Sequence, residues 1–263
     1  MLRSMYSGIS GMKNFQTKLD VIGNNIANVN TYGFKKGRTT FKDLVSQQIS
    51  GAGAGTNPKQ VGLGSQLASI DTVDTQGSLQ TTGRALDLGI SGDGYFVVQN
   101  GSQQFLTRAG NFYLTPTSDT ESKIVNADGY ELLGTDNLPI TIESTAKSFS
   151  VGADGSVNVV QSDGTSSTVN TIAIAKVSNP AGLEKAGSNL YRTSTNSGSL
   201  PASFSGPGID GAGDLVSGAL EMSNVDLSEE FTEMIVAQRG FQANTKIITT
   251  SDEILQELVN LKR

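Results

Sequence analysis

Both ends of the chain carry apolar residues that recur every seven positions. Near the N-terminus these residues are Met5, Met12, Leu19 and Ile26. Near the C-terminus they are Leu227, Met234, Phe241, Ile248 and Leu255. A seven-residue recurrence places one apolar stripe along a helix and is typical of helices that pack against a partner helix. We therefore expect two terminal helices that pair as a coiled coil and then contact neighbouring copies of the chain.

Further apolar residues widen the two stripes, namely Ile22, Phe231 and Leu258. The patterns predict a first helix over residues 2–29 and a last helix from residue 227 to the end. Burial of one apolar side chain contributes ~1.5–3 kcal/mol, and ordering one helix residue costs ~1–2 kcal/mol. Because these terms nearly balance for a single helix pair, we expect the ends to be largely disordered in the monomer and to fold on assembly.

Composition excludes several kinds of chemistry. The 263 residues include no Cys and no His, which removes thiol nucleophiles, disulfides, the usual zinc ligands and imidazole acid–base catalysis. The formal net charge of −6 disfavours nucleic acid as a partner, because phosphate binding needs basic surfaces. No apolar run is long enough to span a membrane. We therefore expect no catalytic residue, no cofactor, no bound metal, no nucleic-acid partner and no membrane insertion.

The middle of the chain has the patterns of β-strands. Short apolar or alternating runs, such as YFVVQ and SVNVVQ, recur over residues 86–222. Many are separated by Asp-Gly or Asn-Gly pairs, at 93–94, 100–101, 128–129, 154–155 and 163–164. Such pairs accept positive φ and favour tight hairpins, so we interpret them as turns rather than calcium ligands. The sequence predicts a mainly antiparallel β-domain, with a Gly- and Ser-rich loop at 195–218.

Residues 34–85 differ from both of these regions. They combine extended patterns with a Gly- and Ala-rich loop at 50–58. The basic residues Lys35, Lys36, Arg38 and Lys42 are interpreted as a solvated surface or a contact between protomers. The predicted fold class is α+β, with a helical core domain of residues 1–33 and 223–263, an extended linker of residues 34–85 and a β-rich outer domain of residues 86–222.

Three stretches resemble the flagellar rod–hook axial family. They are DVIGNNIANVNTYGFKKG at 20–37, GDGYFVVQNG in the β-region, and SNVDLSEEFTEMIVAQRGFQANTKIITTSDEILQELVNLKR at 223–263. The resemblance implies that the two ends pair as coaxial helices in the core of a tube, with the β-domains outside. It also implies that one polar motif shapes the exit of the first helix, formed by Asn24, Asn25, Asn28, Thr31, Gly33 and Phe34.

Within this family we expect a short hook subunit of the Gram-positive type. Distal-rod sequences tend to have Ala where this chain has Gly23 and Leu where it has Ile26. A hook subunit implies a flexible tube that transmits torque from rod to filament. The implied partners are further copies of the chain, the distal-rod protein, the hook cap, the hook–filament junction protein and the flagellar export apparatus. The alternative is a distal-rod subunit, which would form a rigid drive shaft.

The resemblance also implies a location in the hook or basal body, outside the cell, reached through type III export without a cleaved signal peptide. A second class of function stays open, a secreted β-rich adhesin or enzyme that uses axial-type ends as an anchor. The absence of Cys and His favours a structural subunit over an enzyme.

Overall fold

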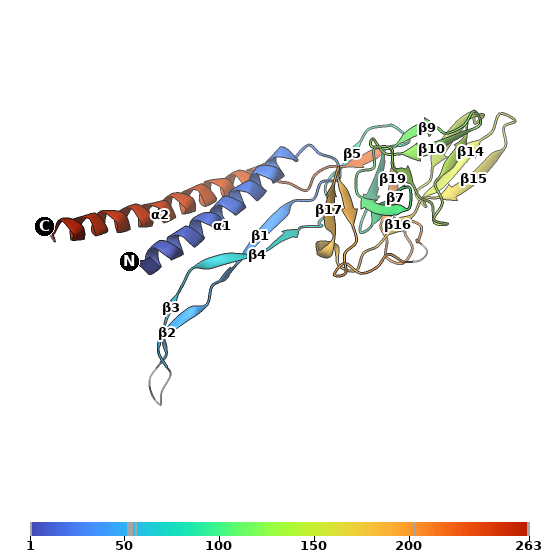
Figure 1. Ribbon diagram of the computed structural model, residues 1–263. Coiled ribbons are helices and arrows are strands. Elements are labelled where there is room, and N and C mark those ends of the chain that lie inside the picture. Colours follow the sequence, from blue (N-terminus) through green and yellow to red (C-terminus); the bar gives the residue numbers. More distant parts are fainter. Residues whose placement is uncertain (1, 52–54, 56, 202–203, 262–263) are drawn as a thin grey trace. The chain divides into compact units, whose positions relative to one another are not determined.

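The computed structural model describes residues 2–51, 55, 57–201 and 204–261 (Figure 1). The chain divides into two compact units, which we name by their content. The helical unit comprises residues 1–27, 37–73 and 225–263, and the β-rich unit comprises residues 28–36 and 74–224. The described residues contain two α-helices and a mainly antiparallel β-region, so the predicted α+β class is confirmed.

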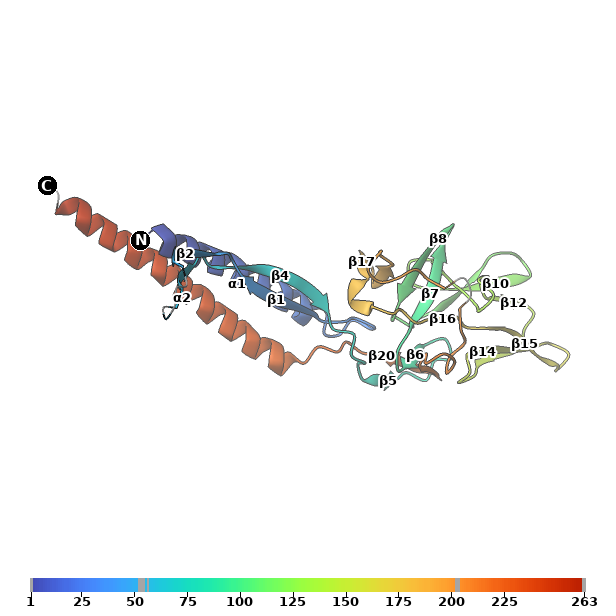
Figure 2. The ribbon, with the colours of Figure 1, turned by 90° about the horizontal axis from the view of Figure 1, so that it is seen from below.

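The helical unit is built on the two terminal helices. Helix α1 spans Leu2–Ala27 and helix α2 spans Leu227–Asn260, and they lie side by side in both views (Figures 1 and 2). Helix α2 begins where the sequence predicts, because the Asp226 side chain accepts hydrogen bonds from the backbone N–H groups of Ser228 and Glu229. Helix α1 ends at Ala27, two residues before the predicted end.

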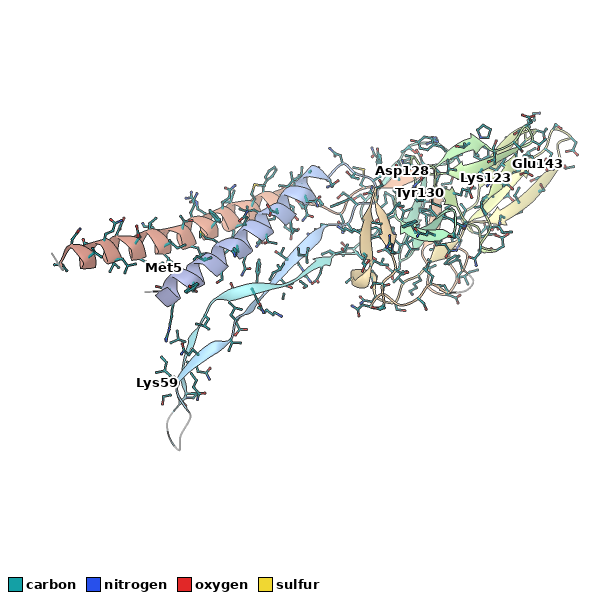
Figure 3. The ribbon with its side chains drawn as sticks, in the orientation of Figure 1. Met5, Lys59, Lys123, Asp128, Tyr130 and Glu143 are labelled. Carbon is teal, nitrogen blue, oxygen red and sulfur yellow. The ribbon has the colours of Figure 1, made fainter. Side chains whose placement is uncertain are left out.

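A long antiparallel ribbon completes the helical unit. Strand β1 (Gly37–Asp43) pairs with β4 (Ser65–Thr72), and both contact α1. The ribbon continues as β2 (Ser46–Ser50) paired with β3 (Lys59–Gly62), where every described side chain is exposed. Figure 3 labels Lys59 at the start of β3. Residues 52–54 and 56 of the predicted loop lie outside the described residues.

The largest sheet of the described chain has nine strands and forms the centre of the β-rich unit. Seven follow the order β12-β10-β11-β7-β8-β18-β17, while β16 pairs with β7 and β9 pairs with β10. Their bounds are β7 Tyr95–Asn100, β8 Gln103–Thr107, β9 Tyr113–Pro116, β10 Glu121–Val125, β11 Glu131–Leu132, β12 Thr141–Glu143, β16 Ile174–Ala175, β17 Glu184–Gly187 and β18 Leu190–Arg192.

Smaller sheets surround this centre. Strands β13 (Ser148–Val151), β14 (Ser156–Val160) and β15 (Ser166–Thr171) form a meander. Strand β6 (Leu88–Ser91) pairs with β19 (Asp214–Ser217), and β5 (Leu79–Thr81) pairs with β20 (Ala219–Glu221). A short 3-10 helix, η1, spans Pro180–Gly182.

The core of the β-rich unit lies between these sheets. Strands β6 and β7 supply fully buried residues, among them Leu88 and Phe96. The Phe96 and Phe112 rings meet edge to face at a centroid distance of 5.3 Å. A second buried cluster contains Tyr95, Leu106 and Tyr191. Alternation along the strands therefore gives the β-rich unit an apolar interior of its own.

Three details differ from the sequence-based expectations. The Asp93-Gly94 pair does not close a hairpin, because β6 pairs with β19 and not with β7. Strand β19 lies within the predicted loop 195–218, of which residues 202–203 fall outside the described residues. The predicted linker is divided, with residues 37–73 in the helical unit and residues 74–85 in the β-rich unit. That the three predicted regions fold as independent domains remains a prediction.

Candidate assembly interface

The predicted apolar residues of α1 and α2 fall into three groups by exposure. Ile22 is buried at 4% exposure. The partly buried residues are Met5, Met12, Leu19, Ile26, Met234, Phe241, Ile248 and Leu255. Leu227 and Phe231 are exposed at 39% and 50%, and the side chain of Leu258 lies outside the described residues. Figure 3 labels Met5 near the start of α1. Part of the predicted seam therefore lies between the helices and part is left open.

Glycines allow the two helices to approach closely. A Cβ atom added to Gly11 would lie 2.8 Å from the side-chain Oδ1 of Asn244. A Cβ atom added to Gly8 would lie 3.4 Å from the side chain of Ile248. Such glycines weaken an isolated helix by about 1 kcal/mol each. At Gly11 the Asn244 side chain occupies the space that a Cβ atom would need, whereas a Cβ atom at Gly8 would make an ordinary van der Waals contact.

Polar contacts also join the two helices. Lys18 on α1 forms an ion pair with Glu233 on α2. The hydroxyl of Thr245 donates to the Met12 sulfur at 3.3 Å. Both contacts lie at the partly exposed margin of the helix pair, where an ion pair contributes about 0–1 kcal/mol. They fix the register of the helices more than they stabilise the pair.

The outer faces of the helices carry large exposed apolar side chains. The set is Tyr6, Ile9, Leu227, Phe231, Ile235, Val236, Ile247, Ile254, Val259 and Leu261. The sequence reasoning did not single out Ile235, Val236 and Ile247, although Val236 and Ile247 lie eleven residues apart and share a helix face with Ile254. Exposed apolar side chains in this number are typical of a protein–protein contact.

Asn25 ties the end of α1 to the first strand. Its Nδ2 donates to the backbone oxygen of Gly37 at 2.9 Å, and its Oδ1 accepts from the backbone N–H of Gly37 at 2.9 Å. The Nδ2 also donates to Glu230 on α2 at 3.2 Å. The side chain is 2% exposed. Asn25 therefore holds three elements of the helical unit together, whereas its neighbour Asn24 is exposed.

The rest of the predicted helix-exit motif belongs to the β-rich unit. The Thr31 hydroxyl donates to Asn28 Oδ1 at 3.2 Å, and the Thr31 backbone N–H donates to the Asn28 oxygen at 3.1 Å. Gly33 has a φ of +68°, and an added Cβ would lie 2.5 Å from the backbone of Ala109. Both the conformation and the space at this position require glycine.

Phe34 and Lys35 point into the β-rich unit. Phe34 is 8% exposed, with the Lys185 ammonium 5.0 Å from its ring centroid. Burial lowers the pKa of Lys185 below its usual value. Lys35 is 1% exposed and forms an ion pair with Glu221. The interpretation of Lys35 as part of a solvated surface is therefore wrong, because a carboxylate distant in sequence neutralises its charge inside the fold.

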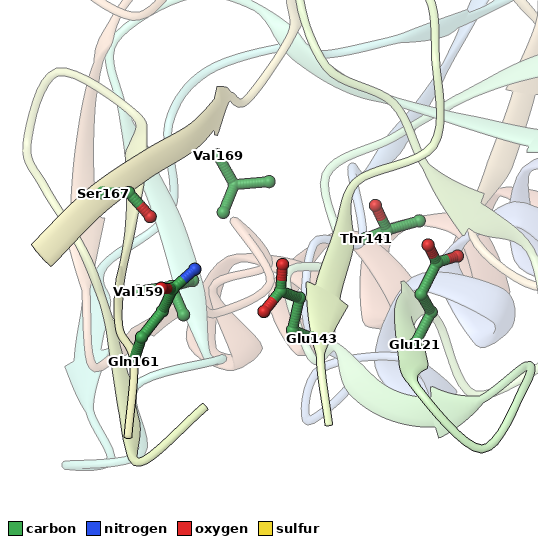
Figure 4. Close-up of a pocket in the computed structure, with 7 residues that line it drawn as sticks. All are labelled: Glu121, Thr141, Glu143, Val159, Gln161, Ser167 and Val169. Atoms are coloured by element: carbon green, nitrogen blue, oxygen red, sulfur yellow. The ribbon is translucent and has the colours of Figure 1, made fainter. Parts of the chain in front are cut away.

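A small cleft lies between two sheets of the β-rich unit. Its volume is about 140 Å³, and Figure 4 shows Glu121, Thr141 and Glu143 facing Val159, Gln161, Ser167 and Val169. Glu121 and Glu143 are direct partners in the pairing of β10 with β12, and both are exposed. Figure 3 places Glu143 on the β-rich unit with Lys123, Asp128 and Tyr130. Without a buried polar group aimed into it, the cleft gives no indication of catalysis.

Two other kinds of site are absent from the described part of the chain. No cluster of three or more His, Cys, Asp and Glu side chains is arranged there to hold a metal ion. Neither described helix combines the length and the apolar character that crossing a membrane requires.

Comparison with known proteins identifies relatives along the whole chain. The profile "Flagella basal body rod protein" matches residues 5–35, "Flagellar hook protein FlgE/F/G D1 domain" matches residues 89–159, and "Flagellar basal body rod FlgEFG protein C-terminal" matches residues 216–261. The flagellar basal-body rod protein FlgG of Bacillus subtilis is 60% identical over 269 residues, with all of both chains covered. FlgG of Borreliella burgdorferi is 37% identical, again over both whole chains.

Hook proteins are more distant relatives. The hook protein FlgE of Borreliella burgdorferi is 32% identical over an alignment of 443 residues that covers both chains fully. The expectation of a hook subunit is therefore wrong, because the rod protein of similar length is far more similar. A Cβ atom added to Gly23, one of the two residues that favoured the hook, would meet nothing within 4 Å, so packing does not restrict residue type there. The chain belongs to the flagellar rod–hook family of axial proteins, which are structural components of the flagellum, and its similarity is greatest to the rod branch.

Proposed function

We propose that this protein is a structural subunit of the distal rod, where many copies polymerise into a stiff hollow shaft that transmits torque. The single observation that carries the proposal is the 60% identity to a basal-body rod protein over both whole chains. The exposed apolar faces of α1 and α2 support it, since burying them requires contacts with other copies. The proposed role is mechanical, and we infer no enzymatic activity.

The interface of this polymer is proposed to be the predicted seam. Ile248 lies beside Gly8 of α1 in one chain, whereas Leu227 and Phe231 remain open for neighbouring copies. The fully exposed ribbon of β2 and β3 offers a second contact, because unpaired strand edges readily add a neighbour. Contacts of this kind along the shaft would resist bending.

Partners and location follow from the same role. The proposed partners are further copies of the chain, other axial proteins next to them in the flagellum, and the flagellar export apparatus. The chain would reach its position outside the cell through that apparatus without cleavage of a signal peptide.

Electron microscopy of polymers grown from the purified chain tests the proposal. We expect straight tubes from the unchanged chain and no tubes from Phe241→Asp, because a buried carboxylate in the seam is strongly unfavourable. The matched control is Leu138→Asp, at a residue that is 60% exposed on the β-rich unit, and it should polymerise normally. Curved, flexible tubes would contradict a rod subunit, and normal tubes from Phe241→Asp would exclude the seam.

A further inference from the structure

The chain passes between the β-rich unit and the helical unit at four points, 27–28, 36–37, 73–74 and 224–225. The last three involve segments of the β-rich unit that end near residues 36, 74 and 224. In the β-rich unit these ends are not held by regular strand pairing, since β5 begins at Leu79 and β20 ends at Glu221. They are held instead by a group of charged and amide side chains. The group lies wholly inside the β-rich unit.

Glu221 is the centre of this group. Its Oε1 accepts from the Lys35 ammonium at 2.8 Å and from the backbone N–H of Gly77 at 2.9 Å. Its Oε2 accepts from Nη1 of Arg108 at 3.0 Å. The side chains of Lys35, Arg108 and Glu221 are each 1% exposed. One carboxylate thus contacts three segments that are far apart in the sequence.

Further hydrogen bonds connect the same segments. Lys35 also donates to the backbone oxygen of Thr75 at 2.9 Å, and the backbone N–H of Gly33 donates to the backbone oxygen of Glu221 at 2.8 Å. Asn224 accepts from the backbone N–H of Lys36 at 2.8 Å and donates to the Thr75 oxygen at 3.1 Å. Each of the three ends is therefore bonded to both of the others.

The group is also joined to the central sheet. Nη2 of Arg108 donates to the backbone oxygen of Gly92 at 2.7 Å, and the guanidinium lies 5.4 Å from the ring centroid of Tyr95 on β7. Asp74 Oδ1 lies 3.9 Å from the Lys35 ammonium. Two cations thus face two carboxylates, which offsets the cost of burying them.

Burying these charges adds little to the net stability of the fold. Well-packed apolar side chains of similar volume commonly serve as well as a buried ion pair or better. What charged groups add is direction, because each donor must meet a particular acceptor. The arrangement therefore suits a part of the fold in which position matters more than net stability.

We propose that Lys35, Arg108, Glu221 and Asn224 form a clasp that locks the three connecting segments to one another and to the central sheet, so that a load on one segment is shared by all. Its mechanical meaning rests on the proposed function, a shaft that carries torque. The clasp itself is a property of the single chain and is tested there.

Hydrogen exchange of the full-length chain tests the clasp directly. The reporters are the backbone amides of Gly33, Lys36 and Gly77, which donate to atoms of the clasp residues. The variant Glu221→Gln keeps the shape and removes the charge that faces two buried cations. We expect exchange of all three amides to accelerate about a hundredfold or more, because an uncompensated buried charge is strongly destabilising.

The Lys36 amide decides whether the clasp acts as a unit. Its acceptor is Asn224, not Glu221, so a purely local effect of Glu221→Gln would leave its exchange unchanged. The matched control is Glu131→Gln, which removes the partly exposed ion pair with Lys123 and should change none of the three amides. Unchanged Lys36 exchange in Glu221→Gln would overturn the proposal.

A measurement on the unchanged chain covers the case in which Glu221→Gln fails to fold. Under increasing denaturant below the unfolding transition, the three amides should open together with one free energy and one denaturant dependence. Independent opening would overturn the clasp and leave the polymer proposal standing. Joint opening in a chain that never forms tubes would support the clasp and overturn the polymer proposal. The failure of one proposal can therefore be told from the failure of the other.

Discussion

Phe15 on α1 faces Gly240 on α2 so closely that a methyl group at position 240 would lie 2.5 Å from the tip of the aromatic ring. Carbon atoms in favourable contact are ~3.5–4.0 Å apart. The ring thus occupies the space that every other residue type at position 240 would need. This contact sets the distance between the helices along that part of the pair.

Replacing Gly240 with Ala is expected to weaken the helix pair. Alanine improves intrinsic helix stability by about 1 kcal/mol, but overpacking costs about 1–3 kcal/mol, so the net expected loss is about 1 kcal/mol. The control is Gly23→Ala, where an added Cβ meets nothing within 4 Å and only the gain remains. Thermal unfolding followed by helical circular dichroism compares the two variants. Equal shifts of the unfolding temperature in the same direction for both variants would show that the Phe15 contact is not tight.

Loss of the cap on α2 should fray the start of that helix. The Asp226 carboxylate accepts from the Ser228 N–H at 2.8 Å and from the Glu229 N–H at 3.4 Å. Asp226→Ala should cost about 1 kcal/mol, visible as faster amide exchange at both positions. The comparison variant is Asp252→Ala, which removes a pair with Gln256 worth only about 0.2–0.5 kcal/mol. Equal losses would argue against a specific role for the cap.

The β-rich unit should lose stability at alkaline pH. Burial raises the pKa of both Tyr95 and Tyr191 above their usual value of 10.0. The folded state therefore keeps these phenols protonated while the unfolded state releases the protons. The two phenols thus leave the free energy of unfolding unchanged below about pH 10 and lower it above that pH. Above about pH 10, the free energy of unfolding of Tyr191→Phe should fall less steeply with pH than that of the unchanged chain, by about 1.4 kcal/mol per pH unit. An unchanged slope in Tyr191→Phe would contradict this prediction.

Trypsin should cut the helical unit of the monomer before it cuts the β-rich unit. Arg239 and Lys246 are exposed on α2, and much of the apolar surface of that helix is uncovered, so local opening is inexpensive in free energy. Arg108 is 1% exposed inside the β-rich unit. Mass spectrometry of the fragments should therefore show cleavage after Arg239 or Lys246 first. Polymerisation should protect both sites, and unchanged cleavage in polymers would place α2 outside the interface.

Local sequence patterns were sufficient to predict much of the fold. The seven-residue recurrence identified both helices because a helix face repeats regularly along the chain. Pairs such as Asn100-Gly101 and Asp163-Gly164 marked hairpins because their glycines adopt positive φ, +61° and +85°.

Long-range pairing explains what the sequence did not reveal. Lys35 looked like part of a basic surface because its neighbours are basic, and its partner Glu221 lies 186 positions away. The ribbon of β1 and β4 could not be assigned to the helices because its contacts with α1 depend on tertiary packing. Gly23 was a poor guide to the branch of the family because no contact limits the residue at that position.

The double hydrogen bond between Asn25 and Gly37 has a mechanical consequence. It joins the end of α1 to the start of β1, so the intervening residues 28–36 form a closed detour in the chain. Tension along α1 can therefore pass directly into the ribbon through Asn25 and Gly37, without stretching residues 28–36. Residues 28–36 therefore keep their hydrogen bonds within the β-rich unit when the helix is pulled.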